Sequence, residues 1–173
     1  MVPAGQARLF SAVLLPDEVV ASLQSELDRH PRGAGARRLR WIEAAQWHVT
    51  LGFYGLDDPQ SRAGWLEQRV TGLPAPTLTL AGGGTFPGVL WTGVLGSGLT
   101  ELAGAVWPEQ DDREFQGHVT LARGDRPQAL AAWARLLAEY RSPEWLAADA
   151  VLMRSDPKPT GPVYTTVERF RLG

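Results

Sequence analysis

Two of the three histidines in this 173-residue chain open the same four-residue phrase. His48 begins His-Val-Thr-Leu at residues 48–51, and His118 begins the identical run at residues 118–121. From composition alone, such an agreement is expected on the order of one time in a thousand, so we treat the repeat as real. It indicates a duplicated structure, a duplicated chemical group, or both.

Each repeat reads as a β-strand with one apolar face and one polar face. Side chains two positions apart in a strand point to the same side. His48 therefore shares a face with Thr50, and His118 shares a face with Thr120. The alternate residues are expected to point into a core: Val49, Leu51, Phe53, Val119 and Leu121. Two such polar faces, set across a cleft, would bring two imidazoles and two hydroxyls into one small volume.

This set of groups suits displacement at phosphorus. An imidazole has an ordinary pKa of about 6.5, so it takes or gives a proton near neutral pH. In-line displacement needs a base on the attacking oxygen and an acid on the departing oxygen, on opposite sides of the phosphorus. Threonine hydroxyls can donate to the non-bridging oxygens. A strained cyclic phosphate is already activated, so such a site requires no metal.

Composition limits the remaining classes. The chain contains no cysteine, which excludes disulfides, thiolate zinc sites and cysteine nucleophiles. Its formal charge of -2 argues against a protein that coats polyanions, although its 17 basic residues comprise one lysine, Lys158, and otherwise arginine. The apolar run at residues 9–15 is too short to span a membrane. We therefore expect one cytoplasmic domain, or two small lobes sharing a core.

Hydrophobic periodicity predicts an α+β fold with antiparallel sheets, because strand pairs interrupt the alternation of strands and helices. Gly82–Gly84 is expected to end a strand in a bend or bulge. A Gly/Pro loop is expected at residues 31–36. The predicted strands are residues 8–15, 39–42, 47–54, 77–81, 89–95, 117–123, 148–153 and 163–172, and the predicted helices are residues 17–29, 57–70, 99–106 and 127–140.

The paired His-x-Thr-x motifs resemble those of the two-histidine phosphoesterase superfamily, in particular its bacterial and archaeal RNA 2′,3′-cyclic phosphodiesterases, once named 2′-5′ RNA ligases. The resemblance covers essentially the whole chain. It rests on RLFSAVLLP (8–16), RWIEAAQWHVTLGFYG (40–55), FPGVLWTGV (86–94), FQGHVTLAR (115–123) and GPVYTTVERFRL (161–172).

The resemblance implies a single bilobal domain over residues 1–173 with pseudo-twofold symmetry, one motif per lobe. Two antiparallel sheets would flank a central cleft, with helices outside. His48 would protonate the leaving ribose oxygen and His118 would activate water, giving a 2′-phosphate. Neither a metal nor a nucleotide cofactor is implied. The substrates would be RNA ends or nucleotides bearing a 2′,3′-cyclic phosphate, with weak reversible 2′-5′ ligation, and nothing requires more than a monomer.

Candidate substrate-binding residues are Arg123, Trp41, Phe53 and Phe86. Arg123 matches the family's basic residue after the second motif. Simple alternation points it away from His118, so it needs a bulge or the strand end to reach phosphate; otherwise it is a surface ion pair. The aromatic rings are either base-stacking platforms or core residues. Many relatives carry Lys where this chain has Gly52, which alternation places on the cleft face.

Two alternative functions stay open. One is a superfamily member that acts on another cyclic phosphate, such as an ADP-ribose cyclic phosphate, or on an RNA 3′ end. The other is a nucleotide-binding module without catalysis, although both intact histidines argue against it.

Overall fold

The computed structural model describes residues 5–30, 39–108 and 111–173, and the loop expected at 31–36 lies outside them. The helices are α1 (Asp17–Asp28), α2 (Pro59–Val70), α3 (Leu99–Ala105) and α4 (Pro127–Leu136), and a 3₁₀ turn, η2, spans Ala44–Gln46. The strands are β1 (Ala7–Leu14), β2 (Arg40–Trp41), β3 (His48–Asp57), β4 (Thr77–Phe86), β5 (Val89–Leu95), β6 (His118–Arg123), β7 (Trp145–Leu146), β8 (Asp149–Asp156) and β9 (Val163–Arg171).

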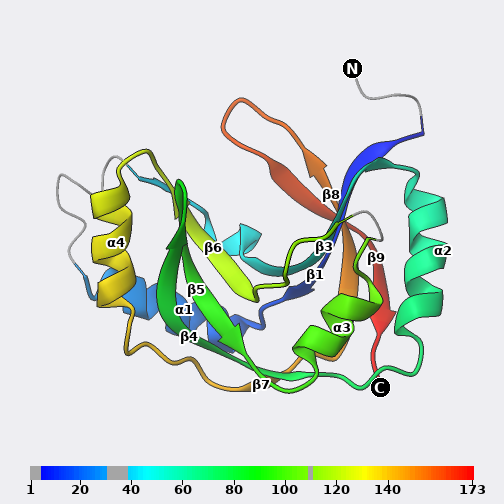
Figure 1. The fold of residues 1–173 in the computed structure, drawn as a ribbon, viewed down its shortest axis with the longest axis horizontal. Coiled ribbons are helices and arrows are strands. Elements are labelled where there is room, and N and C mark those ends of the chain that lie inside the picture. The colour runs from blue at the N-terminus through cyan, green and yellow to red at the C-terminus, as the bar shows by residue number, and fades with distance from the viewer. Residues whose placement is uncertain (1–4, 31–38, 109–110) are drawn as a thin grey trace.

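Every strand pairing among the described residues is antiparallel, which confirms the α+β class. The strands follow one curved path in the order β7-β4-β5-β6-β3-β1-β8-β9, with β2 beside β6 (Figure 1). We call β3, β1, β8 and β9 the terminal half, and β6, β5, β4 and β7 the middle half. The two sheets expected from the sequence are thus two halves of one path, joined where β3 meets β6.

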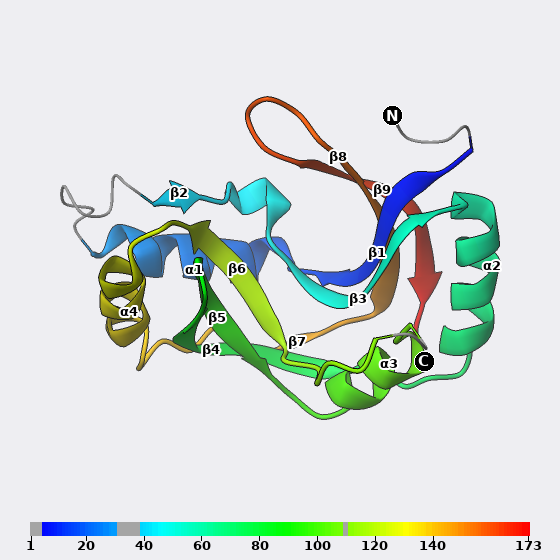
Figure 2. The same ribbon diagram turned by 45° about the horizontal axis from the view of Figure 1, so that its top comes forward.

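Helices cover the outside of both halves, as expected (Figure 2). Helix α2 packs against β9 and α3, and α3 packs against β3, so both belong to the terminal half. Helix α4 packs against β4 and β5 of the middle half, and α1 lies beside it, where Ser22 hydrogen-bonds the hydroxyl of Tyr140 at 2.9 Å. No helix in the described ranges is both long enough and apolar enough to cross a membrane.

Helix α2 begins with a capping residue and a proline. Asp58 caps the helix by accepting a hydrogen bond from the backbone N–H of Ser61 at 3.0 Å. Pro59 occupies the first turn, where its missing N–H costs nothing. The run Asp57-Asp58-Pro59 carries both features in the sequence, and the helix predicted over residues 57–70 is confirmed. Helix α4 also begins with a proline, Pro127, and buries Leu130 and Trp133 on its inner face.

The hydrophobic core is made by the back of the curved sheet and the helices that cover it. Its fully buried side chains are mostly leucines, including Leu51 and Leu121 from the two histidine strands. A separate small cluster contains Phe10, Ala12, Val151 and Met153, with Leu14 and Tyr164 packed against it. Because Phe10 and Tyr164 also line the cavity described below, this cluster supports the wall of the site.

The glycine run Gly82–Gly84 does not end the strand, so that part of the prediction was wrong. Strand β4 continues to Phe86, with the expected irregularity appearing as a register shift between Ala81 and Gly84. A Cβ on Gly83 would lie 2.8 Å from the carbonyl oxygen of Ala134, and one on Gly84 would lie 2.3 Å from the Trp91 ring. The glycines therefore let α4 and an indole approach the strand closely.

Candidate active site

The two histidine strands meet at equivalent positions of their repeats. Val49 of β3 and Val119 of β6 are Cα partners in an antiparallel pair. With this register, His48 lies across from Thr120, and Thr50 lies across from His118. Diagonal neighbours in such a pair are about 7–8 Å apart, so the two histidines lie close together on one side of the paired strands. Both valines are fully buried, which turns the polar side chains to the opposite face.

That face borders a cavity of about 460 Å³, a volume typical of small-molecule sites. His48, Thr50, His118 and Thr120 all line it. The described residues that line it include three arginines and no aspartate or glutamate. Such a set of donors is suited to an anion rather than to a metal cation.

Both imidazoles are held in the same orientation and tautomer. The Nδ1–H of His48 donates to the carbonyl oxygen of Gln46 at 2.8 Å, and that of His118 donates to the carbonyl oxygen of Gln116 at 2.7 Å. A carbonyl oxygen can only accept, so Nδ1 must carry the proton and Nε2 is left to exchange protons with a ligand. No described residue forms a hydrogen bond to either Nε2.

Gln46 and Gln116 were missed at the sequence level, although a signal was present. Each stands two residues before its histidine, so the repeat is really Gln-x-His-Val-Thr-Leu. The side chain of Gln46 has a further role, because its Oε1 accepts a hydrogen bond from the backbone N–H of Tyr164 at 3.0 Å. This bond ties the turn before β3 to the start of β9.

Aromatic rings flank each imidazole. The ring of His48 lies 4.9 Å from that of Phe10 and 5.1 Å from that of Tyr164, centroid to centroid. On the other wall, His118 lies 5.0 Å from Phe86 and 6.0 Å from Trp91. These contacts restrict ring rotation and exclude water from the sides of both imidazoles.

β-Bulges just after the histidines change which residues of β3 and β6 face the cavity. In β3, Ser11 and Ala12 of β1 pair with Gly52 and Thr50, so Leu51 is the extra residue. In β6, Leu90 and Trp91 of β5 pair with Ala122 and Thr120, so Leu121 is the extra residue. After a bulge, the alternation of side chains is shifted by one.

The bulges overturn two predictions made from simple alternation. Phe53 does not point into the core: its side chain is 55% exposed and lines the cavity. Gly52 does not face the cavity: it is buried, and a Cβ there would lie 3.0 Å from the carbonyl oxygen of Val106. In the second strand, the bulge supplies what Arg123 needed, and this residue lines the cavity beside His118.

The remaining binding candidates are placed differently. Phe86 lines the cavity together with Phe53, and both rings also border a neighbouring hollow of about 350 Å³ that includes Trp107 and Phe115. Trp41 does not belong to the described lining. Its ring packs edge-on against Trp133 of α4, at a centroid distance of 4.8 Å.

The sequence model of the family of LigT-like phosphoesterases matches residues 13–95 of this chain. An RNA 2′,3′-cyclic phosphodiesterase of Thermus thermophilus is 32% identical over 186 aligned positions, which cover 95% of this chain and 90% of that protein. The chain belongs to the LigT-like phosphoesterase family. A second RNA 2′,3′-cyclic phosphodiesterase, from Methanothermobacter thermautotrophicus, is 27% identical, with 96% of this chain and 100% of that protein covered. The resemblance inferred from the motifs is confirmed.

The fold of this LigT-like phosphoesterase is also that of a solved relative. The crystal structure of E. coli LigT in its apo form superposes with a TM-score of 0.77 at 23% sequence identity, covering 98% of this chain and 99% of that one. At this identity, the likeness establishes the fold.

Electrostatics distinguish the two imidazoles of this LigT-like phosphoesterase. Burial lowers the pKa of both below the ordinary value, and the backbone hydrogen bond to each Nδ1 opposes that effect. The charge of His118 further lowers the pKa of His48, and the charge of Arg123 further lowers that of His118. The two rings are therefore close enough to influence each other, and Arg123 disfavours the protonated form of His118.

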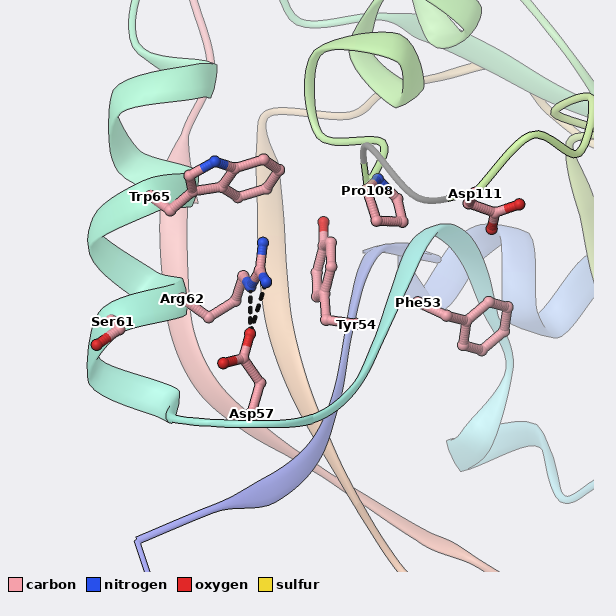
Figure 3. Close-up of a pocket in the computed structure, with 8 residues that line it drawn as sticks. All are labelled: Phe53, Tyr54, Asp57, Ser61, Arg62, Trp65, Pro108 and Asp111. Atoms are coloured by element: carbon pink, nitrogen blue, oxygen red, sulfur yellow. Dashed lines mark hydrogen bonds and ion pairs between the residues drawn. The ribbon is translucent and has the colours of Figure 1, made fainter.

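A second pocket, of about 620 Å³, shares Phe53 with the cavity (Figure 3). Inside it, the guanidinium of Arg62 lies over the rings of Tyr54 and Trp65, at 4.4 and 4.6 Å, and contacts Asp57 at 2.6 Å. The other acid of this pocket, Asp111, is paired with Arg113. The charges of these arginines are already neutralised by aspartates. This pocket of the LigT-like phosphoesterase is therefore less suited to bind a phosphate than the cavity that the histidines line.

Proposed function

We propose that this chain is an RNA 2′,3′-cyclic phosphodiesterase that converts a 2′,3′-cyclic phosphate into a 2′-phosphomonoester. The observation that carries the proposal is the placement of His48 and His118, each with Nδ1 engaged and Nε2 available, on one cavity whose described lining includes no carboxylate. Two relatives support it: the similar proteins of Thermus thermophilus and Methanothermobacter thermautotrophicus are both named RNA 2′,3′-cyclic phosphodiesterase.

The proposed reaction is a single in-line displacement. A water oxygen attacks the phosphorus while its proton passes to Nε2 of His118. The bond from phosphorus to the ribose 3′ oxygen breaks, and that oxygen takes the proton from Nε2–H of His48. The family resemblance supplies this division of roles. The cation of Arg123 agrees with it, because a general base must begin neutral and Arg123 favours neutral His118.

The threonines and Arg123 would stabilise the charge on the phosphoryl oxygens. No described residue forms a hydrogen bond with the hydroxyl of Thr50 or Thr120, so both are available to donate to the substrate. Arg123 supplies a positive charge on the same wall as His118. Donors set in place before the reaction lower the barrier because they need no reorganisation as charge develops.

Phe53 and Phe86 are the rings we propose for contact with the nucleobase. They border the catalytic cavity and the adjoining hollow at once, so a base leaving the cavity would pass between them. Base–aromatic stacking tolerates any base, which fits an enzyme defined by its cyclic phosphate. Trp41 is better explained as packing for α4. All these groups belong to one chain, so we propose a single two-lobed domain acting as a monomer, with 2′-5′ ligation as the weak reverse reaction.

The first test is a product assay with adenosine 2′,3′-cyclic phosphate. We expect hydrolysis to adenosine 2′-phosphate, at the same rate with and without a chelator, because imidazoles, hydroxyls and a guanidinium supply all the required groups. Chromatography that separates the 2′- from the 3′-phosphate checks the product. Exclusive formation of the 3′-phosphate would reverse the assigned leaving oxygen, and tight binding without product would favour a binding module.

The dependence of kcat/KM on pH is expected to be bell-shaped, with its maximum on the acid side of pH 6.5. Activity needs neutral His118, so it falls as the pH drops through the lowered pKa of that group. It also needs protonated His48, so it falls as the pH rises through the lowered pKa of that group. Initial rates at low substrate concentration, from about pH 4 to pH 9, measure both limbs, which belong to the coupled pair. A maximum well above pH 7 would contradict this expectation.

A further inference from the structure

The catalytic cavity extends beyond the histidines to the outer end of β1. Arg8 lies there with an exposed side chain, and both Arg8 and Ser155 line the cavity. Neighbouring side chains connect this end to the catalytic centre. The ring of His48 contacts that of Tyr164 at 5.1 Å, Tyr164 is the Cα partner of Ser155, and Ser155 is the Cα partner of Arg8. Since paired strands lie about 4.8 Å apart, Arg8, Ser155 and Tyr164 form a row across three neighbouring strands, and this row ends at the ring of His48.

Arg8 brings a positive charge that nothing in the described structure neutralises. Of the three arginines that line the cavity, Arg113 is paired with Asp111 at 2.6 Å. Neither Arg8 nor Arg123 forms an ion pair with any described residue. The proposed reaction uses Arg123, which lies beside His118. Arg8 lies on the opposite wall, beyond His48, so it has no part in that chemistry.

An arginine without an ion-pair partner among the described residues, facing a cavity whose described lining has no carboxylate, is suited to bind phosphate, because its planar guanidinium donates several hydrogen bonds to phosphate oxygens. The hydroxyl of Ser155 is a second donor at the same end of the cavity, and no described residue forms a hydrogen bond with it. Two anion-binding ends, with the acid of the reaction between them, fit a substrate that carries two separate phosphoryl groups.

We propose that Arg8 and Ser155 form a second phosphate subsite, which binds the phosphoryl group on the 5′ oxygen of the ribose that carries the cyclic phosphate. This inference rests on the proposed function, in which His48 faces the ribose. Two kinds of substrate have this chemistry. In an RNA 3′ end the group is the last internucleotide phosphate, and in an ADP-ribose cyclic phosphate it is the diphosphate. A lone nucleoside 2′,3′-cyclic phosphate has no such group.

The test compares four substrates by kcat/KM. They are adenosine 2′,3′-cyclic phosphate, the same compound with a 5′-phosphate, the dinucleotide ApA with a terminal 2′,3′-cyclic phosphate, and ADP-ribose 1″,2″-cyclic phosphate. A charged hydrogen bond should favour the 5′-phosphorylated compound by on the order of tenfold or more over the first. The ratio of kcat/KM for the 5′-phosphorylated compound to that for the first compound should fall to near one in Arg8→Gln. In Arg8→Lys part of this preference should remain. It should also weaken with added salt.

Arg154→Gln is the matched control. Arg154 immediately precedes Ser155 on β8, is paired with Asp156 and lies outside the described cavity lining, so its loss should leave the preference intact. Melting curves show whether each variant is folded. Equal losses on all four substrates in folded Arg8→Gln, or a wild-type enzyme without any preference, would overturn the subsite. No turnover of any cyclic phosphate would instead overturn the proposed function. Arg8→Gln should lower kcat/KM most on the kind of substrate that the subsite binds. Comparing its effect on ApA with its effect on the ADP-ribose compound therefore shows whether that substrate is an RNA end or an ADP-ribose cyclic phosphate.

Discussion

His48→Ala and His118→Ala are each expected to lower kcat on a 2′,3′-cyclic nucleotide by about a thousandfold, within the range usual for removing a general acid or base. Each change removes one of the two Nε2 atoms that we propose exchange protons with the substrate. The double variant should lose little more than either single variant, because one displacement step needs both groups at once. Initial rates at saturating substrate measure the effect.

Added imidazole separates this chemical role from a structural one. Each alanine leaves a space between two aromatic rings, and free imidazole entering it should restore part of the rate in the single variants. His30→Ala serves as the control. His30 follows α1, packs edge-on against Trp133 at 5.9 Å and does not line the cavity. Rates that stay near wild type in either cavity variant would refute two-histidine catalysis here.

Arg123→Gln has the second largest expected effect, a loss in kcat/KM of about a hundredfold, as for other groups that stabilise transition-state charge. A second consequence follows from electrostatics. The cation of Arg123 lowers the pKa of His118, so its removal should raise that pKa. Since His118 must be neutral, the acid limb of the pH profile should move to higher pH.

The two readouts together distinguish binding of the phosphate from general damage to the fold. Arg126→Gln is the control, because Arg126 is exposed, follows closely in the chain and does not line the described cavity. It should leave both the rate and the acid limb unchanged. An Arg123→Gln enzyme with a normal pH profile would show that the guanidinium acts too far from His118 for the proposed role.

Local signals in the sequence predicted the elements and the pair of histidines. The Asp58 cap and Pro59 fixed the start of α2 because the chemistry of a helix end involves only neighbouring residues. The duplicated His-Val-Thr-Leu led to the proposed catalytic pair for the same reason, since the repeat is visible without knowing any contact.

Features decided by contacts across the fold were not predictable in this way. The bulges at Leu51 and Leu121 depend on how β3 and β6 pair with β1 and β5, so alternation misplaced Phe53 and Gly52. Tyr164, more than a hundred residues from His48, reaches it only because β8 and β9 return to the terminal half. The run Gly82–Gly84 carries a breaker signal, yet the packing of α4 and Trp91 keeps it within β4.

The positions of α1 and α3 make the protein indivisible. Helix α1 follows β1 of the terminal half but lies beside α4 on the middle half, and α3 follows β5 of the middle half but packs against β3. A fragment containing either histidine strand with its preceding helix would lack the helix that shields its own sheet. We therefore expect that neither half works when transferred alone to another protein, so that the two histidines are inherited together.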